Sequence, residues 1–147
     1  MTKIYFTALL SLLLLDACSG TSKSVYDDYF TSGEFPSGNA IQGEQLFAGS
    51  TVGANNSPGC VPCHAVESDV AIIGPSQVGL ATLAQEALDD PAYEGQTTTV
   101  EGYLWESVVD SKAYLRPEYA DVMYKAYGET LTQQEIADLV AYMMTLE

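Results

Sequence analysis

Two cysteines and the only histidine of this 147-residue chain lie together in the segment Cys60-Val61-Pro62-Cys63-His64. Thiols three positions apart on one short helical turn can both bond to the vinyl groups of a haem, while the histidine that follows reaches the iron. Because the chain has one histidine, bis-His haem and His-rich metal sites within one chain are excluded. The segment therefore predicts one covalent haem c, attached through Cys60 and Cys63, with His64 as an iron ligand.

Three other interpretations of this segment stay open. A thioredoxin-like redox pair also uses two cysteines three apart, but it begins a helix after a strand, and no β-rich run precedes Cys60. A structural zinc site needs a fourth ligand, and the remaining cysteine, Cys18, lies far away along the chain. A disulfide between Cys60 and Cys63 would close a small strained ring. The haem interpretation is favoured because the N-terminus indicates export.

The N-terminal segment is typical of a signal peptide. Lys3 is followed by an apolar run over residues 4–15, which is shorter than the roughly 20 apolar residues of a spanning helix. Residues 15–18 (Leu-Asp-Ala-Cys) resemble the lipobox of bacterial lipoproteins, with an acid where that pattern has a small or uncharged residue. The resemblance implies that residues 1–17 are a signal peptide and that Cys18 is lipidated and anchored to a membrane. The alternative is an ordinary cleaved signal that removes Cys18 or leaves it as a free thiol.

Length and composition allow one small domain with an N-terminal extension, and 47% hydrophobic residues suffice for a packed core. Residues 19–39 are rich in Ser, Gly and Thr and have no helical or strand period. We therefore expect residues 18–38 to be a lipidated flexible tether and residues 39–147 to be the folded domain. The aromatic residues of the tether can dock on this domain or on a partner; they are Tyr26, Tyr29, Phe30 and Phe35.

The charge balance limits the partners. Five lysines and arginines stand against 20 aspartates and glutamates, which gives a net charge of -15. Phosphate binding requires clustered cations, so a nucleic-acid partner is excluded. A strongly negative surface attracts basic surfaces, and salt screens this attraction beyond a Debye length of about 8 Å. We expect partners with basic docking surfaces; the alternative is that the acidity is a solubility or high-salt adaptation.

Over about residues 39–147 the chain resembles the class I (mitochondrial-type) monohaem c-type cytochromes. Residues 41–47 are similar to the N-terminal helix of this family, and Gly43 lies on one face of it with an aromatic residue four positions later. The resemblance implies an all-α fold in which the N- and C-terminal helices cross, with the haem in the core. Residues 73–76 are similar to the loop whose proline carbonyl accepts a hydrogen bond from the proximal imidazole, which implies that Pro75 orients the haem histidine.

Capping signals mark two further helices. Thr132 and Glu135 form a capping box before an apolar stripe at helical spacing, and the segment Thr98-Thr99-Val100-Glu101 predicts a similar box. Residues 80–88 are a short helical candidate. In the family the last helix crosses the first, which implies a close approach at the small residue near the N-terminus, with Phe47 and Tyr142 as aromatic neighbours.

The second iron ligand cannot be a histidine, which leaves methionine, lysine, a terminal group or water. Met143 falls on the apolar stripe of the last helix, where methionine is ordinarily core, and Met144 is adjacent to it. Met123 lies in a proline-marked segment before that helix, where the family places its ligating methionine, with Tyr124 where a proline is usual. The resemblance therefore implies His64 and Met123 as the axial pair.

His/Met ligation with no open position at the iron is an electron-transfer arrangement. The sequence shows no Ser-His-Asp arrangement, phosphate-binding glycine loop or paired carboxylate set. We expect an electron carrier and not an enzyme, with no small-molecule substrate, passing single electrons between membrane redox complexes in the periplasm or on the outer face of the membrane. The alternatives are a permanently bound haem subunit of a membrane oxidoreductase, or a five-coordinate gas-binding or peroxidase protein if Met123 does not bind.

Overall fold

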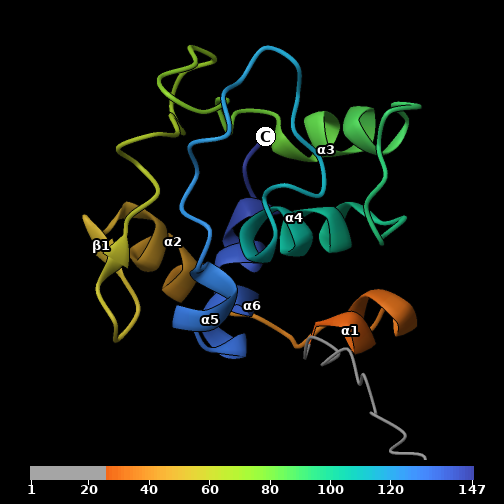
Figure 1. Cartoon of the computed structure of the whole chain (residues 1–147). Coiled ribbons are helices and arrows are strands. Elements are labelled where there is room, and N and C mark those ends of the chain that lie inside the picture. The colour runs from red at the N-terminus through yellow and green to blue at the C-terminus, as the bar shows by residue number, and fades with distance from the viewer. Residues whose placement is uncertain (1–25) are drawn as a thin grey trace, which may run out of the picture.

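The computed structural model describes residues 26–147, and within this range it is mostly helical (Figure 1). The signal peptide and Cys18 lie outside the described residues. The helices are α1 (Asp27–Ser32), α2 (Ala40–Ala48), α3 (Leu80–Leu88), α4 (Val100–Val109), α5 (Tyr127–Thr130) and α6 (Gln133–Met143). Two short strands, β1 (Thr51–Val52) and β2 (Ser57–Pro58), pair antiparallel. The predicted all-α class is confirmed, with this small hairpin as an addition.

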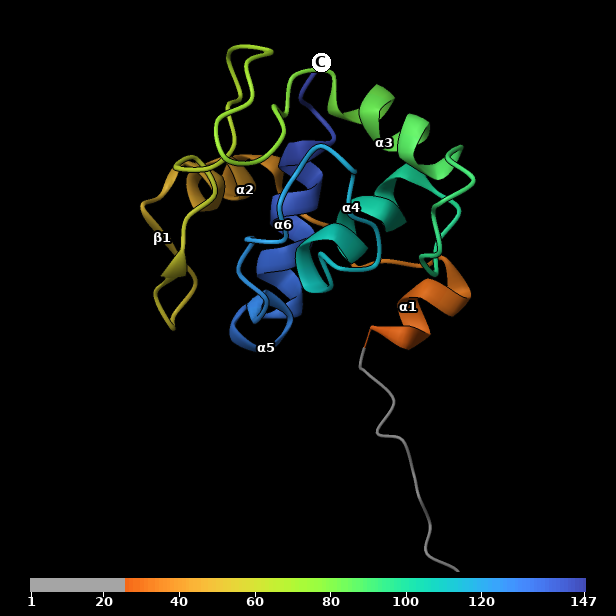
Figure 2. The same cartoon turned by 45° about the horizontal axis from the view of Figure 1, so that its top comes forward.

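Helices α2 and α6 cross in close contact, as the family resemblance implies (Figure 2). A Cβ atom at Gly43 would lie 1.8 Å from the backbone oxygen of Asp138, so no larger residue fits at the crossing. The rings of Phe47 and Tyr142 are neighbours, with centroids 5.5 Å apart. The two ends of the domain are therefore joined through one crossing that depends on a glycine.

The helix starts follow their capping residues. The capping box at Thr132 is present, with the Glu135 side chain accepting from the backbone of Thr132. The box predicted at Thr98 is wrong, because Thr99 is the N-cap of α4 and its hydroxyl accepts from the Gly102 amide. Thr99 has an extended backbone, so the helix begins one residue later than expected. Glu101 is then the second helical residue, one position before the place from which a capping-box acid reaches back to the N-cap.

The hairpin between α2 and the cysteine segment was not predicted. Its strands have two residues each, too few to show an alternating pattern. The Tyr127 hydroxyl of α5 donates to the Pro58 carbonyl at 2.7 Å, and the Gly59 amide donates to the Ser50 carbonyl at 3.0 Å. The hairpin therefore fixes the chain just before Cys60.

The described part of the predicted tether, residues 26–38, is packed on the domain, which is one of the two docking sites expected for its aromatic residues. It contains α1, and Tyr26 is buried with its hydroxyl donating to the Gly128 carbonyl at 2.8 Å. The Tyr29 and Phe35 rings lie 5.6 and 5.4 Å from the buried ring of Trp105 on α4. Aromatic side chains bury enough apolar surface to offset the entropy of ordering a short segment. Within the described residues, no helix has the length and apolar character needed to cross a membrane.

Candidate functional site

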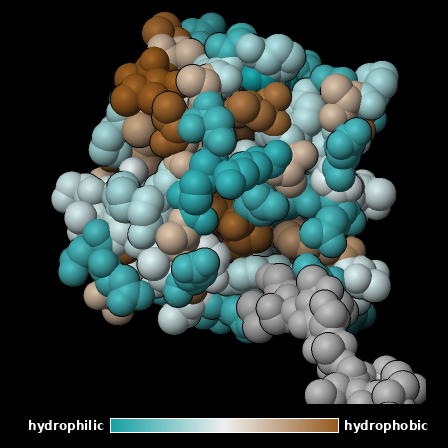
Figure 3. All heavy atoms as spheres, in the orientation of Figure 1, coloured by the Kyte–Doolittle hydropathy of each residue, from teal (hydrophilic) through white to brown (hydrophobic). Residues whose placement is uncertain are grey.

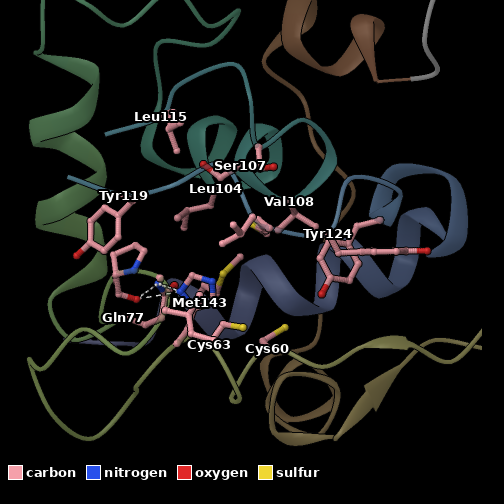
Figure 4. A pocket seen from close by; sticks show the side chains of 18 of the residues that line it. Cys60, Cys63, Gln77, Leu104, Ser107, Val108, Leu115, Tyr119, Tyr124 and Met143 are labelled. Atoms are coloured by element: carbon pink, nitrogen blue, oxygen red, sulfur yellow. Dashed lines mark hydrogen bonds between the residues drawn. The ribbon is translucent and has the colours of Figure 1, made fainter. Parts of the chain in front are cut away.

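A cavity of about 410 Å³ lies beside α4. Much of its wall comes from two loop segments, one within residues 58–77 and the other within residues 111–124. Its lining brings together the predicted site residues, which are Cys60, Cys63, His64, Pro75 and Met123. Figure 4 shows both cysteines and Gln77 on one side of this space and side chains of α4 on another. Residues from helices α2 to α6 all contribute to the wall, so five of the six described helices border this site.

The cysteine segment forms one tight turn. The amides of Cys63 and His64 both donate to the Cys60 carbonyl, at 3.1 and 3.0 Å. Both cysteines are free thiols, so the structure does not contain the disulfide considered above. The turn presents the two sulfur atoms and the imidazole to the same cavity, as thioether attachment to a haem requires.

The surroundings of the thiols argue against the two remaining alternatives. Burial, together with the nearby Cys63, raises the pKa of the Cys60 thiol to about 12, whereas reactive redox cysteines have a lowered pKa. Among residues 26–147, no three His, Cys, Asp or Glu side chains are placed to hold a metal ion, so a zinc site has no ligand set there.

The His64 ring is fixed on two sides. Its Nδ1 atom lies 2.9 Å from the Pro75 carbonyl oxygen, which can only accept, so the proton is on Nδ1 and the Nε2 lone pair is left for a metal. A Cβ atom at Gly74 would lie 2.5 Å from Cε1 of the ring, so only glycine lets the loop lie flat against it. Burial lowers the pKa of His64, with the Pro75 bond opposing it, and this favours the neutral imidazole.

Gln77 is a member of the site that the sequence analysis missed. Its side-chain Nε2 lies 3.2 Å from the Pro75 oxygen and 3.2 Å from Nδ1 of His64. The residue is only 6% exposed and lines the cavity. A polar residue two positions after the proline was the available signal, but its contact with the histidine arises from the fold of the loop.

The three methionines of the domain have different surroundings. Met144 is 44% exposed and does not line the cavity. Met143 is buried in the core on α6 and lines the cavity wall. Met123 is half-buried in the irregular segment between α4 and α5 and also lines the cavity. Two thioethers are therefore available to a group bound in this space.

The residues present fit a haem. The wall is predominantly apolar, as a porphyrin ring requires, and it carries two thiols and a neutral imidazole whose Nε2 is not used by the protein. The glycine against the histidine ring leaves the space that a planar group and its ligand need.

Comparison with known proteins agrees with this chemistry. Residues 40–147 match the family model described as Cytochrome c, and the match includes every residue of the cavity wall. No curated protein matches the chain.

Proposed function

The chain belongs to the cytochrome c family, and from this premise we propose that it shuttles single electrons between membrane redox complexes with His64 and Met123 as the axial ligands of its iron. The family assignment establishes the coarser function, which is electron transfer on one covalent haem c attached through Cys60 and Cys63. The axial pair, the partners and the mode of membrane attachment are the new parts of the proposal.

The haem supplies a one-electron couple, and a thioether ligand favours its reduced state more than a second imidazole does. The chain's residues hold this group in place. The turn at Cys60 sets both sulfur positions, and the Pro75 carbonyl orients the imidazole and increases its donor strength. The buried side chains of Leu104 and Phe47 keep the cavity wall apolar and exclude water.

The observation that carries the axial proposal is that Met123 and His64 line the same cavity from separate segments of the chain. Met123 lies in an irregular segment, which can adjust to bring a thioether to a metal. Met143 is part of the helix α6 core, where its side chain packs among buried neighbours. These differences support Met123 as the ligand and Met143 as packing.

A paired substitution tests the axial ligand. Met123→Ala should keep the covalent haem, lose the red absorption band of thioether-ligated oxidised iron, and lower the reduction potential. Met143→Leu is the matched control, because it removes a thioether from the same cavity while conserving volume, and it should keep both properties. An unchanged band in Met123→Ala, or its loss in Met143→Leu, would assign the sixth position to a different residue.

We also propose that the partners dock through basic surfaces onto the cavity side of the molecule. Exposed apolar side chains gather in the loop that borders the cavity, at Val70, Ile72 and Ile73, and the acids Glu67 and Asp69 lie beside them in the same loop. Figure 3 shows hydrophobic residues grouped within a largely hydrophilic face. An apolar centre with acidic neighbours suits a partner that has a basic rim.

Ionic strength tests this docking. Electron transfer to a basic redox protein should slow steeply as salt rises, and Glu67→Gln with Asp69→Asn should reduce that dependence. Changing the remote Asp27 and Asp28 to amides gives a control of equal charge on α1, which should have a smaller effect on the rate. Equal effects of the two pairs would mean that the net charge, and not this loop, guides the partner.

The packing of residues 26–38 favours a mobile electron shuttle over a permanently bound subunit. Their aromatic rings pack on Trp105 of their own domain, so they are not available as a docking device for another subunit. We propose that lipidation at Cys18 anchors this shuttle to the outer face of a membrane. Purification of the full chain from membranes as a monomer supports this view, whereas stable co-purification with other redox subunits supports the subunit alternative.

A further inference from the structure

We propose that Gln77 is a positioning residue that weakens the hydrogen bond between His64 and Pro75 and thereby raises the reduction potential of the protein. This inference rests on His64 as the proximal ligand in the proposed function and does not depend on Met123. It follows from the position of one buried amide (Figure 4).

The Pro75 carbonyl oxygen has two donors. Nδ1 of His64 lies 2.9 Å from it, and Nε2 of Gln77 lies 3.2 Å from it. The Gln77 backbone amide donates to the Ala65 carbonyl at 2.8 Å, which ties this loop to the residue after the histidine. The side chain is therefore held at the proximal hydrogen bond from a fixed backbone position.

The orientation of the Gln77 amide follows from its partner. A carbonyl oxygen can only accept, so the amide must present its NH₂ group to Pro75. The opposite orientation would set two oxygen atoms against each other at 3.2 Å. The same NH₂ group lies 3.2 Å from Nδ1 of His64, so the positive end of the amide dipole faces the imidazole.

Both contacts act on the imidazole in the same direction. An oxygen that accepts a second hydrogen bond pulls less strongly on the Nδ1 proton, and a nearby positive dipole end disfavours the positive charge that the ring acquires when it donates electrons to a metal. The imidazole becomes a weaker donor to the iron, because its basicity depends on the partner of its other nitrogen. A weaker donor stabilises the oxidised, more positive state less, and the potential rises.

The sign of the effect separates this role from simple burial. If Gln77 only made the cavity more polar, replacing it with an apolar residue would raise the potential, since a drier site disfavours the more highly charged oxidised state. The proposed role predicts the reverse, because the apolar variant restores the full His64 to Pro75 bond.

The test is the midpoint potential of haem-loaded Gln77→Leu. We expect a fall equivalent to about a threefold change in the redox equilibrium constant, or roughly 28 mV at about 59 mV per tenfold for one electron. In the reduced protein, the proton NMR signal of His64 Nδ1–H should move downfield as its bond to Pro75 strengthens. Gln77→Met keeps the side-chain length without the donors and should show the same two shifts. It replaces Gln77→Leu in the test if that variant does not fold.

Ser76→Ala is the matched control. Ser76 is buried in the same loop, but its hydroxyl donates to the Ser68 carbonyl and accepts from the Val78 amide. This variant should weaken the loop and leave the potential and the imidazole signal unchanged. An unchanged or raised potential in Gln77→Leu, or an equal fall in Ser76→Ala, overturns the inference. Either result leaves the assignment of Met123 intact, because that assignment is tested by the red absorption band.

Discussion

The two faces of helix α4 are completed in different ways. On one face, Leu104 and Val108 line the cavity, whose remaining volume of about 410 Å³ is the size of a bound group and not of protein side chains. On the other face, Trp105 is fully buried under the rings of Tyr29 and Phe35 from the N-terminal segment. One helix therefore separates a face that requires a cofactor from a face that the chain covers itself.

The difference shows how a small domain obtains its stability. A chain of this size buries a limited fraction of its surface, and a cavity in its centre removes part of the core. Residues 26–38 add aromatic packing on the face of α4 that lies away from the cavity. Changes on the cavity face of α4 should then affect the visible spectrum and the reduction potential as well as the stability. Changes on the face that carries Trp105 should affect only the stability.

The largest effect should come from leaving the cavity without its group. Without that group, the apolar side chains around a cavity of about 410 Å³ lose their packing partners, and a typical free energy of unfolding is only ~5–15 kcal/mol. Haem-free Cys60→Ser/Cys63→Ser protein should therefore show no sharp calorimetric transition, while the haem-loaded parent does. A sharp transition in the haem-free protein would mean that the cavity closes on itself.

Alanine on each face of α4 should separate the two roles. Trp105→Ala should cost about 3–5 kcal/mol and Leu104→Ala about 2–5 kcal/mol of unfolding free energy, because both side chains are buried. Only Leu104→Ala should shift the visible spectrum and the potential, since Leu104 lines the cavity and Trp105 does not. Only Trp105→Ala should expose residues 26–38 to limited proteolysis. A haem shift in Trp105→Ala would show that the two faces are coupled.

A smaller effect is expected from single hydroxyl groups of the aromatic segment. Tyr26→Phe removes the bond to the Gly128 carbonyl and should cost about 1 kcal/mol, measured by denaturant unfolding. Tyr29→Phe is the control, because its hydroxyl donates to Gln133 at the exposed surface and should matter less. The emission of Trp105, the single tryptophan, reports whether the segment stays docked. A larger loss in Tyr29→Phe would contradict the burial argument.

The features that the sequence predicts well are those whose cause is local. The haem turn at Cys60, the cap of α6 at Thr132 and the small residue at Gly43 each depend on a few neighbouring positions. The partner of the Tyr26 hydroxyl was not predictable in this way, because it is the carbonyl of Gly128, 102 positions away. The same holds for Gln77, whose contact with the histidine exists only once the loop has folded back.

The cap of α4 is expected to give an effect no larger than that of Tyr26, and it tests the local capping signal that misled. Thr99→Ala should cost about 1 kcal/mol, because the hydroxyl that accepts from the Gly102 amide is lost, whereas Thr98→Ala should stay within about 0.5 kcal/mol. The lost cap destabilises the whole helix and does not alter the cavity wall. In Thr99→Ala the unfolding midpoint should therefore fall, while the reduction potential stays constant. A greater cost for Thr98→Ala would restore the sequence-based helix start. A shift of the potential in Thr99→Ala would show that the cavity face responds even to the end of the helix that carries it.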